Sequence, residues 1–334
     1  MRSRYLSPHV IVLCVAAVLL TACGGSQPPI GAAGAMPQSH AIATHGAHGK
    51  SWMLPEAKNS DLVYAASRAE TLIYVYSYPG MKLVGQIPDT NGELGLCSDS
   101  AGNVFVTNSF TNTIDEYTHG GTNPIATFSE DPYKGAAPRG CAVDPSSGAL
   151  AVANEAGSTQ VAVFPQGSSA ATYYSVDGIT SSYFCVYDAR GDLFVDGAPY
   201  GSNSGFGLAE LAAAQSTFSV LTIDKKVETP GALQWDGKHI TLASISNSDN
   251  LVYRVRVYGS SAHVIGTTAL QHAKHIGQSW FLKNKILAPF ASLHGSKASF
   301  IGSWPYPKGG AVKSLVEAPR VELYGLTVSL APHD

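Results

Sequence analysis

The chain has 334 residues, of which only 13% are charged, and its 24 acidic residues outnumber the 21 lysines and arginines to give a net charge of −3. This balance excludes nucleic acid as a partner, because a basic surface is needed to displace the counterions of a phosphate backbone. The 34 glycines and 19 prolines indicate many turns, and the length allows one large all-β domain or two smaller ones.

The N-terminus has the form of an export signal. Arg2 and Arg4 precede an apolar run over residues 10–19, which is shorter than the roughly 20 residues that span a bilayer. The run ends in Leu-Thr-Ala-Cys at 20–23, which resembles the lipobox of bacterial lipoproteins. The resemblance implies that residues 1–22 are a signal peptide removed by cleavage, and that Cys23 carries diacylglycerol and an acylated amine, with palmitate as an expected chain. The alternative is an ordinary signal peptide that ends in a cysteine.

The mature chain is therefore expected at the cell envelope, where two or three acyl chains give a stable membrane anchor. Gly24 lies where an inner-membrane retention aspartate would stand, which favours the outer membrane if the host has one. Residues 23–58, which begin with the lipidated cysteine, are rich in glycine, alanine, proline, glutamine and serine. Such a segment cannot bury enough apolar surface to offset its chain entropy, so we expect a flexible tether.

An internal repeat predicts a single domain over residues 59–334. The segments 95–108, 140–154 and 184–196 each read as a short strand, a turn with aspartate and glycine, and a second strand of alternating apolar residues. Two further strands follow each segment, and weaker copies start at residues 231 and 277. The unit starts at 95, 140, 184, 231, 277 and 325 recur with a period of about 45 residues. Four strands at this period describe one blade of a β-propeller.

The two ends of the domain predict how the ring of blades closes. The last unit start, Gly325, lies close to the chain end at Asp334, so it supplies one strand, whereas residues 61–94 supply three. Together these two segments have the length of one blade period, so we expect the C-terminal strand to complete the first blade and protect its edge. Five complete blades and this shared blade predict an all-β, six-bladed propeller. Residues 208–214 have a helix-forming composition, but the repeat places them on a third strand and the turn after it.

The unit over residues 138–164 resembles the NHL-repeat and YncE-like class of propellers. In that class a Gly-x-x-x-Asp strand precedes Gly-x-hydrophobic-x-Val and then a hydrophobic-x-x-aromatic strand, and here Gly140, Asp144, Gly148 and Phe164 occupy those places. The resemblance covers about 270 residues in coarse form. The sequence contains neither the Asn-His-Leu triplet of NHL repeats nor the WD signature. The RNA binding of some NHL proteins is therefore not expected of this acidic chain.

Two groups of polar residues recur at repeat positions and are candidates for a site. Asp99, Asp144 and Asp188 could form a ring of carboxylates that binds Ca²⁺, but recurrence at every turn favours a role as turn caps.

The second group, Asn108, Asn154, Glu155 and Asp196, follows the second strands. Six-bladed lactonases of the gluconolactonase type bind a divalent metal with such residues. The sequence lacks Gly-x-Ser-x-Gly, His-Glu-x-x-His and a phosphate loop. We therefore assign no catalytic residue, no metal ligand and no cofactor.

Three cysteines remain in the mature domain, in a compartment where disulfides persist. Cys141 and Cys185 occupy one repeat position, whereas Cys97 lies one residue later in its own strand. Successive strand residues point to opposite faces, so Cys97 can face Cys141 across two neighbouring blades. We predict a Cys97–Cys141 disulfide and a free Cys185.

The leading hypothesis is a lipid-anchored, non-catalytic binding or scaffolding module at the cell envelope, with an envelope protein or a small molecule as its ligand. The alternative is a divalent-metal-dependent hydrolase or lactonase. A third possibility is a subunit of an outer-membrane assembly complex.

Overall fold

A computed structural model describes residues 50–67, 70–88, 92–199, 205–244, 250–291, 299–318 and 322–332. The predicted signal peptide, Cys23 and the predicted tether as far as residue 49 lie outside these ranges. Within them the chain is almost entirely β-strand, with a single short 3-10 helix, η1 (Pro55–Asn59), and it contains no helix long and apolar enough to cross a membrane.

Hydrogen bonding groups the strands into sheets that follow one another along the chain. The first sheet has the order β1 (Trp52–Met53), β4 (Lys82–Pro88), β3 (Leu72–Tyr78), β2 (Asp61–Ser67) and β26 (Leu323–Ser329). The second sheet consists of β5 (Glu93–Ser98), β6 (Val104–Asn108), β7 (Thr113–Tyr117) and β8 (Ala126–Ser129). The third sheet consists of β9 (Gly135–Val143), β10 (Leu150–Gly157), β11 (Val161–Phe164) and β12 (Thr172–Tyr174).

The next two antiparallel units share one nine-stranded sheet. Its first unit is β13 (Ile179–Tyr187), β14 (Leu193–Pro199), β15 (Gly207–Leu211) and β16 (Ser219–Ile223). Its second unit is β17 (Pro230–Trp235), β18 (Ile240–Ser244), β19 (Leu251–Tyr258) and β20 (Ser261–Gln271), with β24 (Gly310–Ala311) beside β20. The last sheet is β21 (Trp280–Leu282), β22 (Lys285–Ala291), β23 (Ser299–Pro305) and β25 (Lys313–Ala318).

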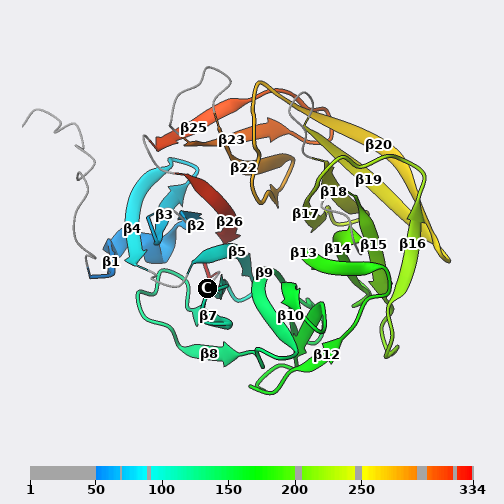
Figure 1. The fold of residues 1–334 in the computed structure, drawn as a ribbon. Coiled ribbons are helices and arrows are strands. Elements are labelled where there is room, and N and C mark those ends of the chain that lie inside the picture. The colour runs from blue at the N-terminus through cyan, green and yellow to red at the C-terminus, as the bar shows by residue number, and fades with distance from the viewer. Residues whose placement is uncertain are drawn as a thin grey trace, which may run out of the picture. The chain divides into compact units, whose positions relative to one another are not determined.

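The sheets of the unit formed by residues 48–334 surround a common centre, and β26, β5, β9, β13 and β17 lie nearest to it (Figure 1). β26 contacts β5, β5 contacts β9, β9 contacts β13, and β13 contacts β17. The arrangement is propeller-like. The described part of the chain forms five hydrogen-bonded sheets rather than the six separate blades expected from the repeat. The reason is that β20 is 11 residues long and pairs in parallel with β16 at Thr222↔Ser261 and Ile223↔Ala262.

The expected closure by the C-terminal strand is confirmed. β26 pairs antiparallel with β2 from Leu62↔Ser329 to Ser67↔Leu323. Strands from the two ends of the propeller-forming chain thus share one sheet. The strand over the helix-forming segment is also confirmed, since β15 runs from Gly207 to Leu211.

The start of the folded unit corrects the predicted tether. Trp52 and Met53 pair with Gln86 and Gly85 of β4, and Ala57 in η1 is fully buried. Residues 50–58 therefore belong to the folded unit, and the boundary predicted at residue 58 was placed too late. Little in the sequence signals this, because the strand is only two residues long, although Met53 and Leu54 pack against the core.

The core lies between neighbouring sheets rather than in one central cluster. β6 and β18 are buried at every position, as expected for strands covered on both faces. Aromatic residues of the strands are buried, among them Tyr64, Phe164 and Phe194. The apolar surface buried between neighbouring sheets stabilises the fold by roughly 25 cal/mol for each Å² removed from water.

Candidate functional site

The repeat aspartates cap their turns, as favoured from the sequence. Asp99 Oδ1 accepts the Asn103 N–H at 2.8 Å, Asp144 Oδ1 accepts the Ser146 N–H at 2.9 Å, and Asp188 Oδ1 accepts the Arg190 N–H at 2.8 Å. These turns join the first and second strands of successive sheets, and we call the end of the ring that carries them the turn end. Burial acts to raise the pKa of Asp144, but hydrogen bonds from Ser147 and Ser146 outweigh it and hold that pKa below its ordinary value.

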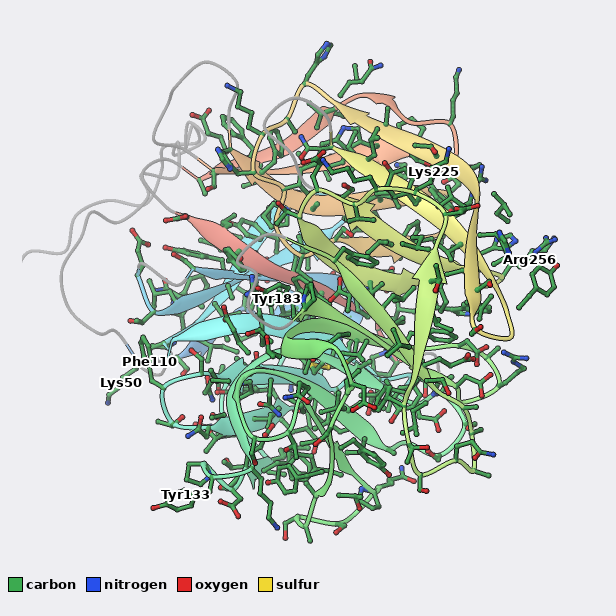
Figure 2. The ribbon with its side chains drawn as sticks, turned by 45° about the vertical axis from the view of Figure 1, so that its right-hand side comes forward. Lys50, Phe110, Tyr133, Tyr183, Lys225 and Arg256 are labelled. Carbon is green, nitrogen blue, oxygen red and sulfur yellow. A yellow bond between two sulfur atoms is a disulfide. The ribbon has the colours of Figure 1, made fainter. Side chains whose placement is uncertain are left out.

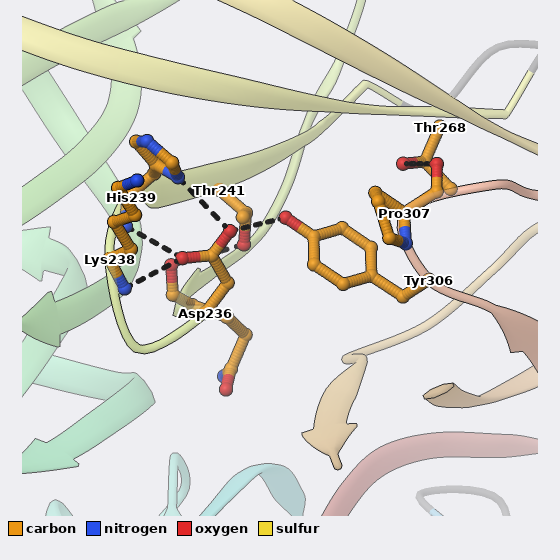
Figure 3. A network of polar contacts seen from close by, with 8 residues as sticks. Asp236, Lys238, His239, Thr241, Thr268, Tyr306 and Pro307 are labelled. Atoms are coloured by element: carbon orange, nitrogen blue, oxygen red, sulfur yellow. Dashed lines mark hydrogen bonds and ion pairs between the residues drawn. The ribbon is translucent and has the colours of Figure 1, made fainter. Parts of the chain in front are cut away.

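A fourth capping aspartate, Asp236, belongs to a network between sheets (Figure 3). Its carboxylate accepts the N–H groups of Lys238 and His239, and its Oδ2 accepts the Tyr306 hydroxyl at 2.5 Å. The His239 Nδ1 lies 3.4 Å from the same Oδ2. Burial would raise the pKa of Asp236, but the hydrogen bonds from Tyr306 and His239 together lower it. The network joins the nine-stranded sheet to the last sheet, and its aspartate, histidine and tyrosine have structural partners.

The structure does not bring the predicted lactonase-type residues together. Asn108 donates to Asp115 at 2.9 Å, and Asn154 donates to Glu130 at 2.8 Å. Glu155 pairs with Arg139 at 3.1 Å, and Asp196 accepts the N–H of Phe184 at 2.8 Å. In the part of the chain that the structure describes, no hydrogen bond or ion pair joins any two of the four predicted side chains, and no group of three His, Cys, Asp or Glu residues could hold a metal.

Glu130 is a buried carboxyl that sequence reasoning missed. It is 5% exposed, and its Oε1 has no partner among the described residues. Burial raises its pKa to about 7, against the lowering effect of its hydrogen bond from Asn154. The residue lies just after β8, outside the repeated motif, so its sequence position carried no signal of burial.

Arg139 joins several sheets near the centre of the ring. Its guanidinium lies 4.3 Å from the centroid of the Tyr183 ring and donates to the Tyr324 hydroxyl at 2.8 Å, in addition to pairing with Glu155. These three aromatic and charged partners come from β13, β26 and β10, and Figure 2 shows Tyr183 near the middle of the molecule. The two terminal nitrogens of Arg139 thus bond protein groups of different sheets, whereas its buried Nε has no partner among the described residues.

Cys97 and Cys141 form a disulfide, with their Cα atoms 5.6 Å apart. This is the pairing expected from the sequence, and it links the second sheet to the third. Cys185 is free and buried, and burial strongly raises the pKa of its thiol. Its low reactivity follows, because the thiolate is the reactive form.

A cavity of about 840 Å³ opens at the turn end and lies against the disulfide-linked pair of sheets. Its apolar wall is aromatic. Phe105 and Phe128 of the second sheet have ring centroids 6.3 Å apart, and Phe128 lies edge-on to Phe164 of the third sheet at 5.3 Å. Trp280 and Phe281 of the last sheet line another wall. The volume falls in the range of sites for drug-sized ligands.

The polar part of the cavity is acidic. Asp61, Asp99, Glu116 and Asp144 line it, and Lys283 is the one basic residue among the lining side chains. Glu116 lies opposite Phe105 in the β6–β7 register, and within the described chain its carboxylate makes no hydrogen bond or ion pair. Burial, followed by the charge of Asp99, raises the pKa of Glu116. The cavity therefore offers an unpaired carboxylate beside aromatic rings, an arrangement that favours a cation with an apolar body.

Comparisons with known proteins identify the fold. No model of a protein family matches the chain, and no curated protein matches its sequence. A chain from the crystal structure of a nidogen–laminin complex matches with a TM-score of 0.61 and 13% identity, over 81% of this chain and 99% of that one. A protein from Bacteroides caccae matches with a TM-score of 0.59 and 11% identity, over 81% and 99%.

A lyase also shares this architecture. The virginiamycin B lyase of Staphylococcus aureus, whose structure contains quinupristin, matches with a TM-score of 0.51 and 12% identity, over 84% of this chain and 95% of that one. The fold is a β-propeller. At identities this low the likeness shows the fold alone, since one fold hosts unrelated functions.

Proposed function

We propose that this protein is a lipid-anchored β-propeller of the cell envelope that binds a small organic ligand in the turn-end cavity and does not catalyse a reaction on it. The cavity carries the proposal. It combines a volume of about 840 Å³ with an aromatic wall and an unpaired carboxylate, the features by which concave sites hold and orient small ligands.

The proposed propeller has six blades. In this interpretation the nine-stranded sheet is two blades, β13–β16 and β17–β20, whose outer strands have joined at two residue pairs. Each half is a four-stranded antiparallel unit like the second and third sheets. The unit starts at 184 and 231 are one blade period apart, which supports two units rather than one.

A binding function fits the side chains better than the metal-dependent lactonase does. That activity would need Asn108, Asn154, Glu155 and Asp196 to converge on one ion, whereas each is committed to a different protein partner. The turn aspartates of the cavity are likewise engaged as caps. Glu116 is the cavity carboxylate that remains available for a ligand.

The ligand class can be tested with two compounds of matched shape. Phenethylammonium carries a positive charge and an aromatic ring, and phenethyl alcohol is its neutral counterpart. At a concentration ten times its dissociation constant, the cation should stabilise the protein by about 1.4 kcal/mol, which raises Tm by about 2 °C. The alcohol at the same concentration should raise Tm less.

Variants of the cavity separate the contributions of charge and ring. Glu116→Gln should remove the preference for the cation, and Phe128→Ala should weaken both compounds. Glu210→Gln is the matched control, because Glu210 holds the equivalent position opposite Phe194 and does not line the cavity. Equal binding of both compounds by the wild type would contradict the charge argument, and no binding of either would contradict the proposed ligand class.

The anchor is tested independently of the ligand. Cells that express the full chain and are fed radiolabelled palmitate should incorporate the label into the protein, and Cys23→Ala should abolish incorporation. Unaltered labelling of the Cys23→Ala variant, or no labelling of the wild type, would contradict lipidation at this cysteine.

A further inference from the structure

The described chain begins at the end of the ring opposite the cavity. β1 runs antiparallel to β4, with Trp52 opposite Gln86 and Met53 opposite Gly85. Lys50 therefore lies toward the Pro88 end of β4, where the chain passes to the next sheet. We call this the connection end, because the last strand of each sheet leads there to the first strand of the next. The aspartate turns, and with them the cavity, lie at the other end of the same strands.

Two exposed aromatic side chains project from the connection end. Phe110, in the turn between β6 and β7, is 69% exposed, and Tyr133, between β8 and β9, is 87% exposed. Their loops are bound to each other, because Asn112 accepts the N–H groups of Glu130 and Ala137 at 2.9 and 3.0 Å. The Phe110 turn is also bound to Gly92, just before β5, by a hydrogen bond from the Ser109 N–H to the Gly92 carbonyl. In Figure 2, Lys50, Phe110 and Tyr133 all project from one side of the molecule.

The lengths allow these side chains to reach a membrane. The segment 24–49 separates the expected lipid on Cys23 from Lys50. With the tether-like composition expected to keep it flexible, a chain of about 26 residues would have a root-mean-square span of about 28 Å, less than the diameter of a propeller domain. The anchor therefore holds the connection end closer to the bilayer than the turn end. Aromatic side chains favour the headgroup region, where an apolar ring and a polar atom can both be accommodated.

We propose that Phe110 and Tyr133 insert into the phospholipid headgroup region, assisted by Lys50 and Lys134, and orient the propeller with its cavity facing away from the membrane. The orientation rests on the proposed lipid anchor, whereas the affinity of this end for phospholipid does not. The occupant of this surface is a bilayer with anionic lipids. Lys134 follows Tyr133 on the exposed loop and adds a positive charge to it, with its ammonium 5.4 Å from the centroid of the Tyr173 ring.

Vesicle binding of the unlipidated protein tests this surface. The mature chain with Cys23→Ser is sedimented with vesicles of phosphatidylethanolamine and phosphatidylglycerol. The double variant Phe110→Ser, Tyr133→Ser should bind about tenfold more weakly, as expected when two rings leave the interface. The matched control is Val220→Ser with Tyr258→Ser, which removes two side chains that are 47% and 61% exposed on other strands. The control should bind within twofold of the parent.

A second measurement covers the case in which the double variant does not fold. An environment-sensitive fluorophore is attached at Tyr133→Cys or at Tyr258→Cys in a Cys185→Ala chain that keeps Cys23 acylated, and the protein is placed in the same vesicles. The label at position 133 should be quenched by spin-labelled lipids, and the label at 258 should not. Equal quenching at the two positions, or equal vesicle binding of the two double variants, would overturn the proposal. If the protein incorporates palmitate but the label at position 133 is not quenched by spin-labelled lipids, the lipid anchor stands and the proposed orientation is wrong.

Discussion

Replacing Glu130 with glutamine should change how the stability of this protein depends on pH. The folded-state pKa of Glu130 is raised to about 7, from an ordinary value of 4.5, because the carboxyl is buried. Between these values the folded protein keeps a proton that the unfolded chain releases, so raising the pH destabilises the fold. The difference between the two pKa values corresponds to about 3 kcal/mol, which is lost as the pH rises from the lower value to the higher. Glutamine is uncharged at every pH and keeps the oxygen that accepts from Asn154.

Urea unfolding of the wild type and Glu130→Gln at pH 4.5 and pH 8 measures this effect. The two proteins should have similar free energies of unfolding at pH 4.5, and the variant should be more stable by about 3 kcal/mol at pH 8. The contributions of other buried carboxyls to the pH dependence cancel in the comparison, because both proteins carry the same groups. Glu228→Gln, at a site whose side chain is 57% exposed, is the control and should follow the wild type. A stability difference between wild type and Glu130→Gln that is the same at both pH values would refute the reasoning.

Three further predictions concern the contacts between sheets. Cys141→Ser removes a crosslink over 44 residues and should lower the free energy of unfolding by about 4 kcal/mol, measured in denaturant without reductant, whereas an unchanged midpoint would contradict the crosslink. Gly95→Ala places a methyl group against the Arg139 carbonyl oxygen and should cost about 3 kcal/mol, while Gly80→Ala, with open space around it, should be nearly neutral in the same assay. Tyr306→Phe removes the hydroxyl that donates to Asp236 and should lower stability by about 2 kcal/mol, with thermal unfolding as the measurement and an unchanged Tm as the contrary result.

The repeat predicted the parts of the fold that depend on local pattern. The alternation of apolar residues after each Asp turn gave the first and second strands, and the position of Cys97 one residue beyond its repeat equivalent placed it opposite Cys141. The lengths of the incomplete units at the two chain ends predicted that β26 pairs with β2. These features were readable because each depends on spacing within a unit of known period.

The repeat could not predict the contacts between outer strands. The pairing of β16 with β20 joins only two residue pairs, and no recurrent motif marks them. The edge strand β1 is likewise two residues long and lies in a segment of tether-like composition. Glu116 resembles Glu210 in sequence position, and only the cavity beside it distinguishes the two. A site between sheets depends on the shape of the cavity that they enclose. The repeat within each sheet does not predict that shape.

Asp196 shows how one repeat position can keep a hydrogen bond to the backbone while its residue type changes. In the second sheet, Thr107 Oγ1 accepts the Gly95 N–H at 3.0 Å and donates to the Arg139 carbonyl at 2.7 Å. At the equivalent position, Asp196 accepts the Phe184 N–H, and its Oδ2 has no partner among the described residues. Burial raises the pKa of Asp196 well above its ordinary value. The residue that suggested a metal ligand in the sequence therefore bonds the backbone of its own sheet, at the position that a threonine hydroxyl holds in the second sheet.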